Sequence, residues 1–218
     1  YTTQAWIKKA NRKNEILLQN LEKTAAFLGN KSDYPAKELN EMWKILLLNQ
    51  FHDIIPGSSI GKVYDDAKKD HEKISKTATS LLNSSIEKAS QAFQTAGMKS
   101  PILLLNTSSF ERNETVKIAG KERTSGTIPP NGYKIIDIAA PAKIAREQEV
   151  KTTARGIENE FIKARFDESG RLTSLVEKKS GRNIIPKGYY GNEFQLFEDY
   201  PNAYDAWDID IHFEEKKE

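Results

Sequence analysis

The sequence contains no cysteine, which excludes a disulfide framework and a thiolate metal site. It also has no apolar run near the ~20 residues that a membrane-spanning helix needs. Charge of one sign does not dominate, because 33 lysines and arginines are balanced by 31 aspartates and glutamates. No basic stripe stands out, so we expect no nucleic-acid partner and no membrane. The lack of cysteine and of a signal-peptide pattern favours a cytoplasmic protein.

The composition that remains is that of a globular protein. Hydrophobic residues make up 38% of the chain and charged residues 29%, which is far from a disordered composition. At 218 residues the chain has room for one or two domains.

Apolar spacing predicts three helices in the first part of the chain. The first runs from about Gln4 to Leu28, the second from about Ala36 to Phe51, and the third from Ile60 to Gly97. The third keeps a near-heptad stripe over its whole predicted length. Short loops join the three, so residues 1–97 are expected to form an antiparallel three-helix bundle.

After Gly97 the apolar period changes to that of strands. The predicted strands are Pro101–Asn106, Glu114–Ala119, Tyr133–Ile138, Glu160–Phe166, Leu172–Glu177, Glu193–Glu198 and Asp208–Phe213, with a connector over Ala140–Arg155. We therefore expect residues 98–218 to form part of an antiparallel β-sandwich. The predicted fold class is α+β with two domains, a helical bundle followed by an incomplete sandwich.

The stretch that carries candidate chemistry follows the second predicted helix. His52 and Asp53 come directly after it, Pro56-Gly57 breaks the chain, and Ser58 or Ser59 is placed to cap the third helix. Two ionisable side chains among apolar residues need compensation. A divalent cation such as zinc would supply it, because imidazole and carboxylate both bind zinc. The alternative is a histidine that only interacts with the helix dipole.

The second predicted helix is apolar on nearly every face, so one flank needs a cover that the bundle does not supply. Ile45, Leu48 and His52 share that flank. We expect it to be an exposed apolar patch or a contact with another copy of the chain.

Two further groups are candidates. His71 lies on the stripe of the third helix, and we interpret it as a surface or rim histidine rather than a metal ligand. Trp207, Asp208 and Asp210 combine an aromatic ring with two carboxylates on one face of a predicted strand. This combination is found in sugar-binding sites and also at ordinary sandwich rims, so both interpretations stay open.

One sequence resemblance covers nearly the whole chain. Glu41–Asn49 followed by Gln50–Ile60 resembles the signature of glycoside hydrolase family 38, the zinc-dependent α-mannosidases. Further segments resemble other parts of that family: Tyr1–Ala5, Ile157–Phe161, Phe166–Leu172, Gln195–Asp199 and Asp205–Asp210. The resemblance identifies the chain as an internal part of such an enzyme, without its N-terminal catalytic domain and the rest of its β-domain.

The resemblance implies a retaining α-mannosidase that hydrolyses terminal α-mannosyl residues through two carboxylates. His52 matches a zinc ligand of the family, and Asp53 matches a position that contacts a sugar hydroxyl. The nucleophile, the acid/base and the other zinc ligands are expected upstream of Tyr1. The chain alone is therefore expected to be inactive and to hold no zinc tightly.

The partners that this identification implies are an α-mannoside and the missing domains, and a second copy of the chain is a further candidate. Two alternatives are a non-catalytic carbohydrate-binding β-sandwich with a helical spacer, and a coiled-coil interaction protein with an appended sandwich.

Overall fold

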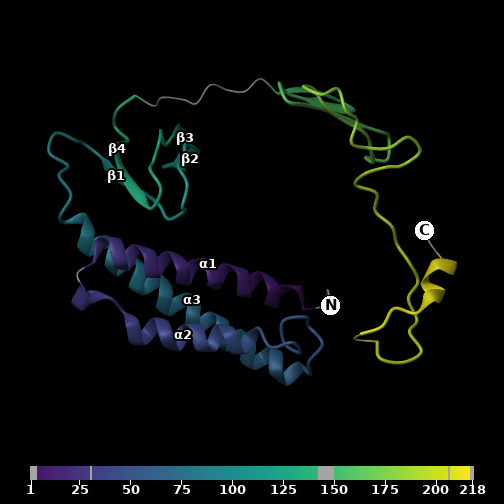
Figure 1. Cartoon of the computed structure of the whole chain (residues 1–218), viewed down its shortest axis with the longest axis horizontal. Helices are drawn as coiled ribbons and strands as arrows, with labels where there is room; N and C mark the ends of the chain where they lie inside the picture. Colours follow the sequence, from purple (N-terminus) through teal and green to yellow (C-terminus); the bar gives the residue numbers. More distant parts are fainter. Residues whose placement is uncertain (1–3, 30, 142–149, 206, 217–218) are drawn as a thin grey trace. The chain divides into compact units, whose positions relative to one another are not determined.

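The computed structural model describes residues 4–29, 31–141, 150–205 and 207–216. Two compact units make up the chain, Tyr1–Lys143 and Ile144–Glu218, both drawn in Figure 1. Tyr1–Thr3 of the family-like segment and residues 142–149 of the predicted connector lie outside the described residues. Within the described part of the chain, no helix has the length and apolar character needed to cross a membrane.

The first unit begins with three helices, α1 (Ala5–Leu28), α2 (Ala36–Asn49) and α3 (Gly61–Ser90), which lie side by side in Figure 1. A short 3-10 helix, η1 (Lys31–Asp33), lies between α1 and α2. The three helices bury one apolar cluster, whose fully buried members include Leu18, Leu21, Leu46 and Ile74. Burying each such side chain stabilises the fold by about 1.5–3 kcal/mol. The predicted bundle is confirmed.

The third helix ends earlier than predicted. It stops at Ser90, and the amide of Ala92 bonds to the carbonyl of Ala89 in a turn. Phe93, counted as part of the helical stripe, instead places its ring 4.7 Å from that of Tyr133 in a strand of the same unit. Its apolar surface therefore has a long-range partner, which periodicity cannot reveal.

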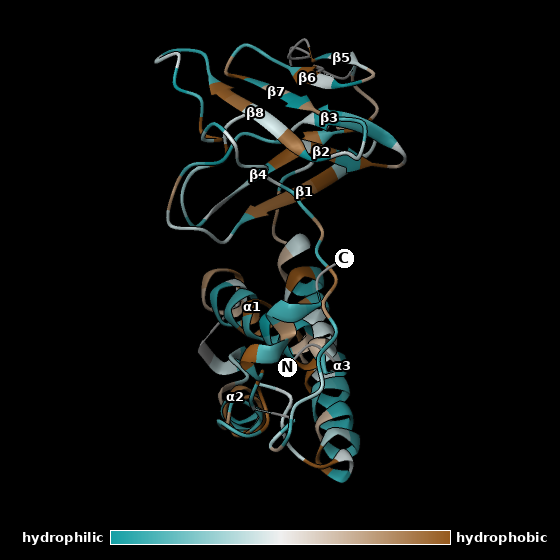
Figure 2. Cartoon of the chain, turned by 90° about the vertical axis from the view of Figure 1, so that its right-hand side faces the viewer, coloured by the Kyte–Doolittle hydropathy of each residue, from teal (hydrophilic) through white to brown (hydrophobic). Residues whose placement is uncertain are grey.

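Two small antiparallel sheets complete the first unit. β1 (Pro101–Asn106) pairs with β4 (Gly132–Asp137), and β2 (Thr115–Ile118) pairs with β3 (Lys121–Thr124). The turn between β2 and β3 consists of Ala119 and Gly120, both with positive φ, as a two-residue hairpin turn requires. In Figure 2, β1 is coloured mostly as hydrophobic, whereas much of the ribbon of α3 is coloured as hydrophilic.

The second unit contains a four-stranded antiparallel sheet in the order β5 (Lys151–Thr153), β6 (Gly156–Glu158), β7 (Ile162–Phe166) and β8 (Leu172–Glu177). The observed combination of a helical bundle with antiparallel sheets confirms the predicted α+β class. The predicted boundary after residue 97 lies inside the first unit, between α3 and β1, and it stays a prediction.

Two predicted strands are wrong, and three observed strands were missed. Glu193–Glu198 forms no strand, and the predicted strand Asp208–Phe213 overlaps a 3-10 helix, η2 (Ile211–Glu215). β3, β5 and β6 were not predicted because they are short and rich in Lys, Glu, Thr and Gly. Their pairing comes from neighbouring strands rather than from their own composition.

Candidate metal-ligand turn

The candidate site is a tight turn after the end of α2. The helix ends at Asn49, and the amides of Ile54 and Ile55 both bond to the carbonyl of Phe51. Gly57 then takes a φ of 99° and donates its amide to Ile54. Only glycine adopts that φ readily. This reversal brings the chain directly to the start of α3.

His52 and Asp53 lie on the open side of this turn. Nε2 of His52 is 3.4 Å from Oδ2 of Asp53, and their side chains are 77% and 44% exposed. The His52 ring lies beside Phe51, with ring centroids 4.2 Å apart. The prediction that His52 points away from the bundle core is therefore confirmed.

Several large apolar side chains near the pair in sequence are also exposed. Leu47, Leu48, Phe51 and Ile60 are between 51% and 72% exposed. We call these four residues the apolar rim. Ile45, predicted to share this flank, is instead partly buried against the bundle core. Leu48 is exposed as predicted, whereas the contiguous apolar patch beside His52 stays a prediction.

The turn is anchored from α3 and α1. The Ser59 hydroxyl donates to the Asp53 carbonyl at 2.6 Å, and the Ser59 amide donates to the Tyr64 hydroxyl at 3.0 Å. The Tyr64 hydroxyl lies 3.3 Å from the Ile54 carbonyl, to which it donates. From α1, the Lys8 ammonium donates to the Pro56 carbonyl at 2.9 Å.

These contacts correct the predicted serine cap. The N-cap of α3 is Ile60, and it makes no side-chain cap hydrogen bond. Ser59 turns its hydroxyl back to Asp53, and the Ser58 hydroxyl oxygen is buried without a hydrogen-bond partner among the described residues. Sequence reasoning missed the role of Tyr64 because it counted this residue only as part of the helical stripe. A buried tyrosine hydroxyl needs a partner, and that signal was available.

His71 is not part of this site, and its interpretation as a surface histidine is wrong. It is 4% exposed, and its Nδ1 lies 3.0 Å from Nδ2 of the buried Asn14. Burial lowers the pKa of His71, and the nearby charge of Asp70 opposes that shift in part. The ring edge contacts Trp6, with centroids 6.3 Å apart. The ring of His71 therefore packs in the interior of the bundle.

The donor set at the turn is compatible with one side of a metal site. An exposed imidazole with an adjacent carboxylate supplies the nitrogen and oxygen atoms that zinc accepts, and a structural zinc site normally has four ligands. Among the residues that the structure describes, no group of three or more His, Cys, Asp or Glu side chains could hold a metal ion. His52 and Asp53 are therefore a partial donor set.

Trp207, Asp208 and Asp210 belong to the second unit. The Asp210 carboxylate accepts the Asn202 amide at 2.7 Å and so closes a loop before η2. The amides of Trp207 and Asp208 both donate to the carbonyl of Tyr204. The same-face argument for the two aspartates fails because they lie in a loop and not in a strand. Trp207 is 45% exposed.

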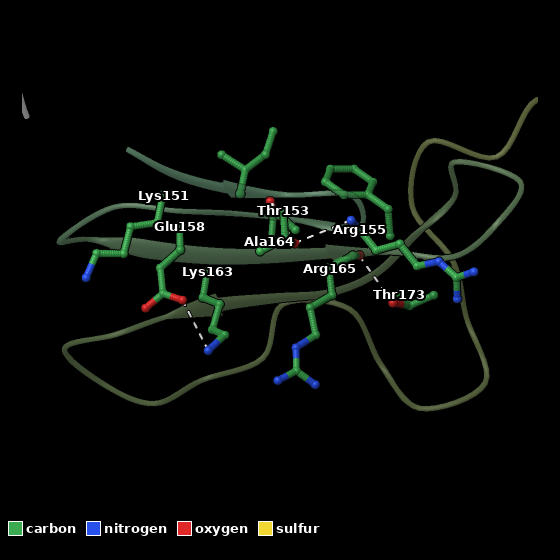
Figure 3. Close-up of a pocket in the computed structure, with 11 residues that line it drawn as sticks. Lys151, Thr153, Arg155, Glu158, Lys163, Ala164, Arg165 and Thr173 are labelled. Atoms are coloured by element: carbon green, nitrogen blue, oxygen red, sulfur yellow. Dashed lines mark hydrogen bonds and ion pairs between the residues drawn. The ribbon is translucent and has the colours of Figure 1, made fainter. Parts of the chain in front are cut away.

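A hollow of about 450 Å³ lies on the sheet of the second unit and is shown in Figure 3. Basic side chains line much of it, including Lys151, Lys163 and Arg165. Glu158 accepts hydrogen bonds from Lys178 at 2.7 Å and Lys163 at 3.1 Å, which lowers its pKa to about 2. The ion pair between Glu158 and Lys163 accounts for two of the charges that line the hollow without a ligand.

Comparisons with known proteins agree with the sequence resemblance. Residues 1–88 match the model of the alpha mannosidase middle domain, and residues 157–218 match that of the glycosyl hydrolases family 38 C-terminal domain. The chain is 35% identical to human alpha-mannosidase 2C1 over its whole length, and 29% identical to the alpha-mannosidase of Saccharomyces cerevisiae over 97% of its length.

These relatives are much longer than the chain, which spans 22% of the human protein and 18% of the yeast protein. A crystal structure of a family 38 protein from Enterococcus faecalis has the same fold. It matches with a TM-score of 0.67 at 19% identity, over 82% of this chain and 30% of the other. From the two domain matches, the chain belongs to glycosyl hydrolase family 38 and carries sequence of its middle and C-terminal domains.

Proposed function

We propose that the full-length protein is a zinc-dependent retaining α-mannosidase and that this chain supplies His52 as one zinc ligand. The observation that carries the proposal is the exposed His52–Asp53 turn, with its side chains open and its backbone anchored. The turn lies in the part of the chain that matches the alpha mannosidase middle domain. The names of the relatives support the mannosidase activity.

Each residue of the pair has a distinct role in this proposal. His52 binds the metal through a neutral imidazole nitrogen, and Asp53 accepts a hydrogen bond from a sugar hydroxyl as a carboxylate. A bound zinc ion would act as a Lewis acid and a template for the sugar.

The apolar rim fits the same proposal. Four large apolar side chains that remain exposed beside a polar pair are typical of an interaction surface. We propose that they pack against the catalytic domain of the longer protein, which would bring the nucleophile, the acid/base and the remaining zinc ligands to His52. The alternative is that a second copy of the chain packs on this rim.

We also propose that the protein is cytoplasmic.

It follows that the 218-residue chain alone neither hydrolyses mannosides nor holds zinc tightly. Of the four ligands of a closed zinc site, this proposal assigns one, His52, to the chain, and each missing ligand lowers the affinity. The carbohydrate-binding and coiled-coil alternatives do not require an ionisable pair on an open turn, so no observation favours them.

The test is metal analysis beside mannosidase kinetics on the full-length protein. His52→Ala should lose zinc and lower kcat together, because a ligand is removed. Asp53→Asn should keep most of its zinc and turn over more slowly. His212→Ala, which removes another exposed histidine, is the control. Full zinc occupancy with normal turnover in His52→Ala would refute the proposed function.

A further inference from the structure

The hydroxyl groups of Tyr64 and Ser59 both form hydrogen bonds to the turn that precedes α3. Tyr64 is only 5% exposed, and it lies in the first turn of α3. Its ring meets Trp6 of α1 edge-on, with centroids 6.4 Å apart. Because two helices fix the ring, the hydroxyl at its tip has a defined position at the base of the turn.

That hydroxyl bonds to the backbone on both sides of the turn. It accepts the Ser59 amide at 3.0 Å, and its single proton is shared between the carbonyls of Ile54 at 3.3 Å and Asp53 at 3.5 Å. The Ser59 hydroxyl adds a shorter bond to the Asp53 carbonyl at 2.6 Å. The peptide group that follows Asp53 is thereby held from two directions.

This arrangement matters because the turn itself leaves His52 and Asp53 exposed. Within the described part of the chain, these side chains contact each other and the ring of Phe51, so their orientation depends on the backbone beneath them. Ligands that are fixed before the metal arrives bind it more tightly, and outer-sphere partners contribute strongly to metal affinity.

We propose that Tyr64 and Ser59 are positioning residues that hold the His52–Asp53 turn in the conformation that binds the metal. The inference rests on the proposed function, since it assigns these hydroxyls to the same site. Neither residue touches the metal or the sugar in this proposal. Each acts through the carbonyl oxygens of Asp53 and Ile54.

The test compares zinc affinity in the full-length protein, measured by competition with a chelator. Tyr64→Phe keeps the ring beside Trp6 and removes only the hydroxyl, and Ser59→Ala removes the second hydroxyl. Each should weaken zinc binding by about tenfold or more, in the range seen for outer-sphere partners. Ser59→Thr keeps a hydroxyl and should restore the affinity of the unmodified protein.

Two matched controls remove the same groups elsewhere in the first unit. Tyr34→Phe deletes a partly exposed tyrosine hydroxyl before α2. Ser85→Ala deletes a serine hydroxyl that also donates to a backbone carbonyl, that of Leu81 within α3. Both should bind zinc as the unmodified protein does, because neither hydroxyl touches the turn.

Amide hydrogen exchange in the zinc-free protein gives a readout that is independent of activity. In Tyr64→Phe the Ser59 amide loses its acceptor, so its exchange should accelerate roughly fivefold, as expected for one lost hydrogen bond. In Tyr34→Phe it should not change. If Tyr64→Phe does not fold, the zinc affinities of Ser59→Ala and Ser59→Thr still test the positioning role.

The outcomes separate this inference from the proposed function. Zinc loss in His52→Ala, with tenfold weakening in Tyr64→Phe and Ser59→Ala, supports both. Zinc loss in His52→Ala with affinity within twofold of normal in Tyr64→Phe and Ser59→Ala overturns the positioning role and leaves the proposed function intact. Normal zinc binding in His52→Ala overturns the proposed function and this inference with it.

Discussion

Lowering the pH should destabilise the helical bundle through His71. Nδ2 of Asn14 lies 3.0 Å from both the backbone carbonyl and Nδ1 of His71. A carbonyl oxygen only accepts, so the atom beside it is the amide NH2 group, and Nδ1 must accept its second hydrogen. The neutral ring therefore carries its proton on Nε2, which is buried without a partner among the described residues.

Protonation of His71 would place an N–H group against the amide donor and a charge in the bundle interior. Burial already lowers the pKa of His71 from its usual value of 6.5. As the pH falls through 6.5, the unfolded chain binds a proton that the folded chain does not, so the free energy of unfolding decreases. The loss reaches at most about 1.4 kcal/mol per pH unit and stops once the folded histidine protonates. Above about pH 7 the effect is absent.

The assay is urea unfolding between pH 8 and pH 5, followed by tryptophan fluorescence. A Trp207→Phe background leaves Trp6 in α1 and Trp43 in α2 as reporters of the bundle. In that background, His71→Gln should lose stability less steeply below pH 6.5 than the parent. His212→Gln, an exposed control, should follow the parent.

Two results would refute the reasoning about His71. One is a His71→Gln variant whose stability falls with pH as steeply as that of the parent. The other is an NMR titration of the folded chain in which the ring of His71 has a midpoint at or above 6.5.

The remaining predictions concern stability and use the same unfolding assay. Leu46→Ala should cost about 2–5 kcal/mol because Leu46 is fully buried, whereas Leu48→Ala should change stability by less than about 0.5 kcal/mol because Leu48 is 62% exposed. Equal losses in the two would contradict the assigned core. Asn106→Ala should cost about 1–3 kcal/mol, because its buried amide donates to three backbone carbonyls between residues 110 and 129. Asn113→Ala, at an exposed position, should lower the free energy of unfolding by less. A larger loss in Asn113→Ala than in Asn106→Ala would contradict the stabilising role of the Asn106 hydrogen bonds.

The helical part of the fold was predictable because its signals are local and long. The first two helices begin and end within two residues of the predicted bounds, since both are long apolar segments and Gly29 ends the first of them. The sheets were less predictable because a strand depends on its partners. All three residues of β5 are exposed and are either Lys or Thr, and its pairing with β6 alone makes it a strand.

Buried polar groups show a second limit of reading the sequence. A stripe of apolar positions identified the core face of α3, and both Tyr64 and His71 lie on it. The stripe says that a side chain is buried but not where its polar atom points. For His71 the partner is Asn14, 57 residues earlier in the chain. Such pairs depend on the three-dimensional packing of α1 and α3, so the spacing within either helix cannot supply them.

The same limit applied to the candidate site. Its candidate ligand side chains were predictable, whereas the hydrogen bonds that anchor their turn were not. His52 and Asp53 could be named as candidates from their motif and the family resemblance, because ligand chemistry belongs to the side chains themselves. The anchoring of their turn could not, because it joins the hydroxyls of Ser59 and Tyr64 to backbone carbonyls. Ser59 is the instructive residue: its type and position predicted a helix cap, and the α3 N-terminus was left without one. A cap forgone in favour of a bond to Asp53 indicates that the turn, rather than the start of α3, is what this serine stabilises.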